Sequence, residues 1–152
     1  MVTLVAGISD EHLEKLYQAE EIKNTGDDFR SAEPIDHPLV SYYSVFQAKT
    51  FLGAFLCVQF SRVEVELHSL LLHTSVRFSR KAMKLMLNTI FSNKSVNRVT
   101  GWIRSDYKTI INHGLKLGFL KEGVKRYGAV KNGKNLDVVL MGMTRDDWEK
   151  QL

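Results

Sequence analysis

Glu66 and His68 are the side chains of this sequence best placed to move a proton. They alternate with apolar residues between positions 63 and 72, so in an extended strand both lie on one face. A carboxylate on a buried strand is costly unless it has a partner, so polar residues there carry information. The pair can act as a general base, directly or through water. The alternative is that Glu64, Glu66 and His68 line a solvated groove or pair with Arg62, Arg98 or Arg104.

A basic stretch follows at once, where the strand would turn into a helix. It contains Arg77, Arg80 and Lys81 in the first helical turn, with Lys84 one turn later. A helix N-terminus offers unpaired N–H groups and a partial positive charge, which favour anions and disfavour cations. Either an anionic ligand compensates these cations, or they are simply solvated.

The composition is that of an ordinary globular protein with one domain, residues 1–152. Hydrophobic residues make up 44% and charged residues 25%, and the net charge of +4 suits phosphate-bearing ligands or acidic partners. The single cysteine, Cys57, excludes an internal disulfide and favours a reducing compartment. We find no secretory signal, no apolar run of bilayer length and no histidine pair with metal-ligand spacing. We therefore expect a cytoplasmic protein without a membrane segment or a metal site.

Hydrophobic periodicity predicts the elements that position these residues. We expect helices at 10–23, 79–91 and from 106, with a short one after Thr144, and strands at 2–6, 42–48, 51–60, 63–72, 98–104, 119–130 and 136–143. Single helices between strands imply parallel neighbours, whereas hairpins such as the one at Asn132-Gly133 imply antiparallel ones. The expected class is α/β (α+β), with a mixed, mostly antiparallel sheet of six to seven strands and helices on both faces.

Residues 24–40 lose all periodicity and contain many turn formers, including Pro34 and Pro38. Loops of this length in a compact domain are often functional, although an ordinary surface excursion with some helix fits equally well. Phe29 and Ile35 are expected to anchor this loop to the body of the protein.

The order of elements and three stretches resemble the GNAT (Gcn5-related N-acetyltransferase) superfamily. The stretches are the strand, basic turn and helix at 63–91, the helix that ends at Leu117-Gly118-Phe119, and the closing hairpin from Glu122 to Trp148. The last is similar to that of N-acetyltransferases of the ribosomal-protein type. The resemblance covers most of the chain. It implies a GNAT-like fold and acetyl-CoA-dependent transfer to a primary amine of a small molecule or of a protein N-terminus.

The resemblance also assigns residues. In the family, the turn before the helix reads Arg or Gln, two residues, Gly, one residue, Gly or Ala, and its N–H groups hold the coenzyme A pyrophosphate. Here Arg77 matches the first position and Ala82 the last. The implied coenzyme contacts are Leu70, Leu72, Arg77, Phe78, Ser79, Arg80, Lys81 and Ala82, and the implied catalytic residues are Glu66 and His68.

Two departures from the family pattern support a second hypothesis. Arg80 stands in the central glycine position, and Gly114 stands where the family often has the tyrosine that reprotonates the thiolate. Bacteriophage genomes encode divergent GNAT-like proteins, so the chain resembles a catalytically silent assembly protein of a head or virion. It would then bind copies of itself or other assembly proteins. Nucleic acid is not expected as a partner, because the aromatic residues are not interleaved with the basic ones.

Overall fold

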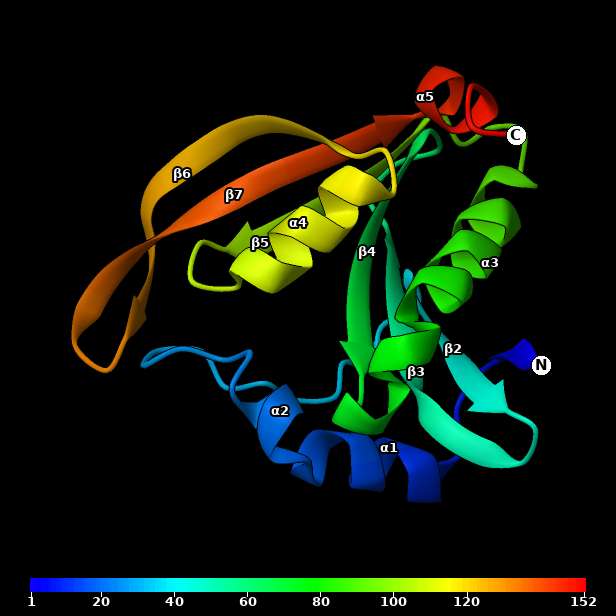
Figure 1. Ribbon diagram of the computed structural model, residues 1–152. Helices are drawn as coiled ribbons and strands as arrows, with labels where there is room; N and C mark the ends of the chain where they lie inside the picture. The colour runs from blue at the N-terminus through cyan, green and yellow to red at the C-terminus, as the bar shows by residue number, and fades with distance from the viewer.

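The computed structural model describes residues 1–152, apart from the side chains of residues 74 and 75. A seven-stranded sheet in the order β1-β2-β3-β4-β5-β7-β6 forms its centre (Figure 1). The strands are β1 (Val2–Ala6), β2 (Val40–Gln47), β3 (Thr50–Gln59), β4 (Glu64–Leu71), β5 (Arg98–Arg104), β6 (Leu120–Lys131) and β7 (Lys134–Thr144). The helices are α1 (Asp10–Gln18), α2 (Glu20–Lys23), the 3-10 helix η1 (His73–Phe78), α3 (Ser79–Phe91), α4 (Lys108–Lys116) and α5 (Arg145–Glu149).

Helices cover both faces of the sheet, as predicted. Val65 and Leu67 of β4 are buried in one core cluster with the apolar side of α3, and α4 packs against the same cluster. Leu70 of β4 belongs to a second cluster, together with Leu16 of α1 and Ile22 of α2. Successive side chains of a strand point to opposite faces, so the odd-numbered residues of β4 face α3 and the even-numbered ones face α1 and α2.

The sheet opens between β4 and β5, the only parallel pair of strands in the described sheet. Their pairing covers three positions, from Glu64 with Arg98 to Glu66 with Thr100. Beyond these positions β4 continues for five residues and β5 for four, while their far edges stay paired with β3 and β7. The two strands visibly diverge in Figure 1. We call this opening, between residues 67–71 and 101–104, the fork.

Several predicted local features are confirmed. Strands β1 and β5 and helix α3 have the predicted bounds. Asn132 and Gly133 both adopt positive φ, 52° and 75°, in the turn between β6 and β7. Ser9 caps α1, and Thr144 forms a capping box with Asp147 at the start of α5.

The predicted continuous helix 10–23 is wrong. Ala19 is extended, with ψ of 135°, and separates α1 from α2. Leu16 and Ile22 are both buried in the cluster beneath β3. Six residues of an unbroken helix would turn these two side chains about 120° apart. The break allows both to pack on the sheet.

The predicted apolar anchoring of the loop at 24–39 is also wrong. The side chains of Phe29 and Ile35 are 87% and 47% exposed. The loop is held instead by polar contacts of its backbone and of Asp28, whose carboxylate accepts the N–H groups of Asn132 and Gly133 at 2.8 Å each. A loop without apolar burial can still be ordered when its backbone groups find partners.

Gly53→Ala tests the close approach of β3 to β4. Gly53 has a φ of 129°, and an added Cβ would clash with the carbonyl oxygen of Leu70 and lie 2.8 Å from Cα of Leu71. We expect the free energy of unfolding to fall by about 2 kcal/mol or more, because strain and overpacking add. Urea denaturation measures the change. Gly123→Ala is the matched control in β6, since nothing lies within 4 Å of its added Cβ. Equal losses in the two variants would contradict this explanation.

Candidate active site

Glu66 and His68 form a hydrogen-bonded pair on β4, at the point where the fork begins. Nε2 of His68 lies 3.0 Å from Oε2 of Glu66, and both side chains are partly exposed. Glu66 is the last β4 residue paired with β5, and His68 is the next residue on the same face. A carboxylate can only accept, so Nε2 carries the proton of this bond. The other ring nitrogen, Nδ1, has no partner among the described residues.

The electrostatics of the pair favour a charged carboxylate. The hydrogen bond from His68 lowers the pKa of Glu66 from its ordinary value, and this outweighs the opposing effect of burial. Glu66 is therefore ionised at neutral pH. It can therefore hold the imidazole of His68 in one orientation.

The neighbouring arginines are occupied by other acids. Arg98 contacts Glu122 at 2.6 Å and Glu64 at 3.7 Å, and Thr100 donates to Glu64 at 2.6 Å. Among the described residues, no arginine forms an ion pair with Glu66. Of the alternatives open from the sequence, arginine pairing thus applies to Glu64, the neighbouring acid on the same face.

The unpaired edge of β4 presents backbone groups to the fork. The N–H of Leu72 donates to the carbonyl of Leu52 at 2.9 Å, so even-numbered residues direct their backbone groups toward β3. The carbonyl of Val63 accepts the N–H of Asn97 at 2.7 Å, so odd-numbered residues direct theirs toward β5. This alternation is a property of any strand.

Ser69 and Leu71 therefore offer their backbone N–H and C=O groups to the fork, and Leu67 offers its C=O group. Leu70 and Leu72, which the resemblance assigns to coenzyme, direct theirs to the β3 side, and the side chain of Leu70 is buried with α1 and α2. The part of Leu70 and Leu72 in coenzyme binding stays a prediction. That the backbone groups of odd-numbered residues face the fork could have been inferred only with the strand order known.

The helix α3 begins without a side-chain cap. Its N-cap residue is Phe78, and its first turn contains no acid. The 3-10 helix η1 leads directly into it, and both the N–H and the hydroxyl of Ser79 donate to the carbonyl of Val76. One of the backbone donors that the resemblance assigns to pyrophosphate is thus already engaged.

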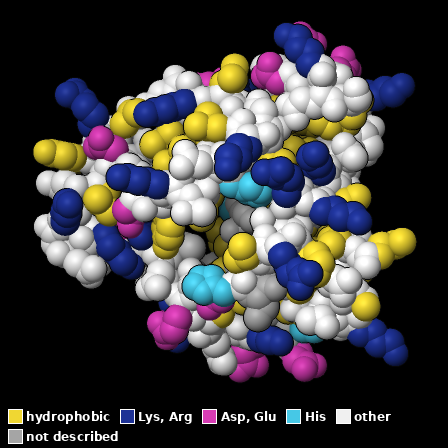
Figure 2. Space-filling model, in the orientation of Figure 1, with side chains coloured by type: hydrophobic (Ala, Val, Ile, Leu, Met, Phe, Trp, Pro, Cys, Tyr) yellow, Lys and Arg dark blue, Asp and Glu magenta, His cyan; other side chains and the backbone are white. Residues whose placement is uncertain are grey.

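The cations around this helix start remain available to an anion. Arg77, Arg80 and Lys81 are exposed, and none forms an ion pair among the described residues. The guanidinium of Arg77 lies over the ring of Phe78, 5.3 Å from its centroid. Ala82, on the inner side of α3, is buried and contributes to packing. Figure 2 shows a hollow in this face of the molecule, with Lys and Arg side chains gathered along its upper rim.

His113 of α4 is a residue that the sequence did not single out. Its Nε2 is buried and has no hydrogen-bond partner in the part of the chain that the structure describes. Burial lowers its pKa, and the charges of Arg80 and Lys116 lower it further. The ring is therefore neutral near neutral pH and has an unsatisfied nitrogen close to the basic start of α3. The sequence gives no signal for this, because Arg80 and His113 come near each other only in the folded protein.

Gly114, which the resemblance aligns with the family's tyrosine, is closely packed. A Cβ added at Gly114 would lie 3.1 Å from Cε of Met141, a core residue of β7. A tyrosine there would require Met141 to move.

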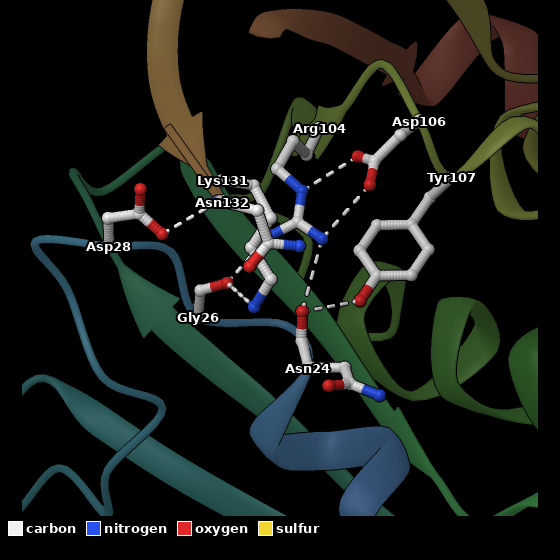
Figure 3. A network of polar contacts seen from close by, with 8 residues as sticks. All are labelled: Asn24, Gly26, Asp28, Arg104, Asp106, Tyr107, Lys131 and Asn132. Atoms are coloured by element: carbon white, nitrogen blue, oxygen red, sulfur yellow. Dashed lines mark hydrogen bonds and ion pairs between the residues drawn. The ribbon is translucent and has the colours of Figure 1, made fainter. Parts of the chain in front are cut away.

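Arg104 of β5 organises a polar network that the sequence did not predict (Figure 3). Its side chain is only 9% exposed. Its guanidinium donates to both carboxylate oxygens of Asp106, at 2.7 and 3.1 Å, and to the carbonyls of Gly26 at 2.6 Å and Asn24 at 3.1 Å. The network ties the start of the loop at 24–39 to the end of β5.

In the described chain, no helix is long and apolar enough to cross a membrane. No group of three His, Cys, Asp or Glu side chains among the described residues could hold a metal ion.

Asp106→Asn tests the contribution of this network through its pH dependence. The hydrogen bonds from Arg104 hold the pKa of Asp106 below its ordinary value of 3.8. A lowered folded-state pKa stabilises the protein above the ordinary value, and this stabilisation is lost as the pH falls through the folded-state value.

We therefore expect the variant to be less stable than the original chain at pH 7. We expect the difference to shrink below a pH of about 4. Urea denaturation at pH 7 and at several pH values below about 4 measures it. Asp36→Asn, in the exposed loop, is the control and should show little difference throughout. A gap that stays constant with pH would contradict the assignment.

No family model matches the sequence, and no curated protein sequence matches it. Solved structures do match. The spermidine N-acetyltransferase of Vibrio cholerae in complex with CoA and spermine superposes with a TM-score of 0.81 at 15% identity, over 97% of this chain and 98% of that one. The spermidine/spermine N-acetyltransferase SpeG of the same organism, in complex with manganese ions, superposes with a TM-score of 0.79 at 16% sequence identity. The match covers 99% of this chain and 96% of that one. A single-residue variant of SpeG superposes with a TM-score of 0.82 at 14% sequence identity, over 99% of this chain and 97% of that one. The chain therefore has the fold of the GNAT N-acetyltransferases.

Proposed function

We propose that this protein is an acetyl-CoA-dependent N-acetyltransferase that acts on a primary amine. The observation that carries the proposal is the Glu66–His68 pair at the start of the fork. A base lies there beside a strand edge with unpaired polar groups. The fold supports the proposal, because the similar structures are enzymes that acetylate amines and one of them is in complex with CoA.

The fork and the basic helix start are together suited to a coenzyme A ester. The pantetheine arm contains amide groups, and the backbone of Leu67, Ser69 and Leu71 can pair with them as an added strand does. Arg77, Arg80 and Lys81 can neutralise the pyrophosphate. Because the side chain of Arg80 points to solvent, it can replace the missing glycine contact by a charge-assisted one. Acetyl-CoA supplies the thioester whose acetyl group is transferred.

The amine must lose a proton before it can attack. His68 accepts this proton at Nδ1, the ring nitrogen that no other described residue contacts. Glu66 holds Nε2–H and so keeps the ring in place. Glu64 cannot orient His68 in this way, because its carboxylate already binds Thr100 and Arg98. The amine nitrogen then bonds to the thioester carbonyl carbon, the carbon–sulfur bond breaks, and the leaving coenzyme thiolate takes up the proton that the amine released.

The alternative, a catalytically silent assembly protein of a bacteriophage, rests on Arg80 and Gly114. It differs from the proposed enzyme in one measurable respect. A silent protein has no need to retain affinity for acetyl-CoA, and the next experiment distinguishes the two.

Isothermal titration with acetyl-CoA tests coenzyme binding. We expect a measurable Kd, and we expect Arg77→Ala and Arg80→Ala each to weaken it by about tenfold, because each removes a charge-assisted contact with phosphate. Lys94→Ala, beyond the far end of α3, removes the same charge and should leave the affinity unchanged. No binding at millimolar acetyl-CoA would exclude the enzyme and favour the assembly protein.

Substitution of the pair tests the base. We expect His68→Gln to lower kcat by a factor of about 10² or more. Glu66→Gln should lower kcat by about tenfold and leave the Kd of acetyl-CoA unchanged, because an amide orients the imidazole less firmly than a carboxylate does.

Turnover is measured as thiol release, with spermidine as the first acceptor probe. Glu64→Gln is the matched control on the same face of β4 and should keep the turnover of the unsubstituted chain. Equal losses in the Glu64 and Glu66 variants would exclude the assigned roles.

A further inference from the structure

We propose that helix α2 acts as a clamp across the open end of the fork, with Glu21 and Tyr107 as positioning residues for the amine acceptor. This inference rests on the proposed function for the identity of the acceptor. The clamp itself rests on contacts at the two ends of a four-residue helix.

One end of α2 is attached to the end of β4. Oε2 of Glu21 accepts the backbone N–H of His73 at 2.9 Å. His73 opens η1, two residues after the last residue of β4. This hydrogen bond is the main cause of the lowered pKa of Glu21, so the carboxylate that makes it is charged at neutral pH.

The other end of α2 is attached to the end of β5. The carbonyl of Asn24, the C-cap residue of α2, accepts the hydroxyl of Tyr107 at 2.7 Å and the guanidinium of Arg104 at 3.1 Å (Figure 3). Arg104 is the last residue of β5. The carbonyl of Gly26 adds two further contacts, from Arg104 at 2.6 Å and Lys131 at 3.0 Å.

The two attachments fix a helix that cannot hold its own position. Four residues form barely one turn, and so short a helix is not stable alone. Ile22 buries its side chain in the cluster beneath β3. The hydrogen bonds of Glu21 and Asn24 then fix the two ends of the helix. Because these contacts lie at the ends of the two diverging strands, α2 spans the opening between them. In Figures 1 and 2 the hollow lies beside β4, with α4 above it and α2 below.

The clamp lies on the acceptor side of the sheet. Ile22 packs with Leu70, an even-numbered residue of β4, so α2 covers the face that also carries Glu66 and His68. The basic start of α3 lies toward the opposite face, which α3 covers. A looser α2 should therefore disturb the approach of the amine to His68 and leave the phosphate contacts of the coenzyme intact.

Two variants release one end each with little other change. Tyr107→Phe removes the hydroxyl that binds Asn24 but keeps the ring, which lies 4.8 Å from the guanidinium of Arg104. Glu21→Ala removes the acceptor for His73. Glu21→Gln is the matched control, because its amide oxygen can still accept that N–H and should restore the behaviour of the unsubstituted chain.

Hydrogen exchange of the amides at 20–26, followed by mass spectrometry, tests the clamp directly. We expect Tyr107→Phe and Glu21→Ala each to accelerate this exchange by about fivefold to tenfold, the effect of one lost hydrogen bond. Exchange in β3 and β7 should stay unchanged. In the double variant, the acceleration should differ from the product of the two single effects, because both contacts hold one helix. Unchanged exchange at 20–26 in both single variants overturns the clamp.

Kinetics with spermidine as acceptor probe test its consequence. We expect the KM for the acceptor to rise about fivefold in Tyr107→Phe and Glu21→Ala, with kcat within twofold and an unchanged Kd for acetyl-CoA. Faster exchange with an unchanged acceptor KM overturns the positioning role. If the unsubstituted chain acetylates no amine, the proposed function fails, and the exchange measurement alone decides the clamp.

Discussion

The three-residue parallel contact between β4 and β5 is the constraint on which the rest of the site depends. Each of these strands is held along its far edge, β4 by β3 and β5 by β7, so their near edges can separate after Glu66 and Thr100 without loss of the sheet. The separation leaves backbone donors and acceptors without sheet partners. Such groups are costly when buried and unpaired, so an opening of this kind favours a ligand with polar groups of its own.

The same opening separates two electrostatic environments. On the α3 side, Arg77 and Arg80 are exposed and have no acidic partner among the described side chains, and His113 stays neutral through burial and the nearby positive charge. On the α1 and α2 side, the carboxylates have partners: Glu64 has Arg98, Glu66 has His68, and Glu21 has the backbone of His73. An anionic coenzyme and an amine would thus approach the fork from opposite faces. Each would meet groups of the complementary kind.

Local signals predicted the local structure well. Periodicity located α3, β1 and β5 to the residue, and Asn132-Gly133 located the last turn, because these depend on neighbours within a few positions. Periodicity does not predict the break at Ala19, because the break depends on the packing of both Leu16 and Ile22 against the sheet. The exposed Phe29 was mistaken for an anchor, because a polar network holds the loop at 24–39 instead of apolar packing.

Alternation and helical spacing are properties of the chain alone, so they suffice to put Glu66 and His68 on one face of β4 and cations at the start of α3. The partners of these residues depend on the fold. It directs Arg98 to Glu64 and Glu122, and turns Arg104 toward the loop after α2. It also places His113 near Arg80 and opens the fork. These outcomes depend on contacts between residues 20 to 80 positions apart, such as Glu21 with His73 and Asn24 with Arg104. No local periodicity encodes such contacts, because their free energy arises only once the strands have their order in the sheet.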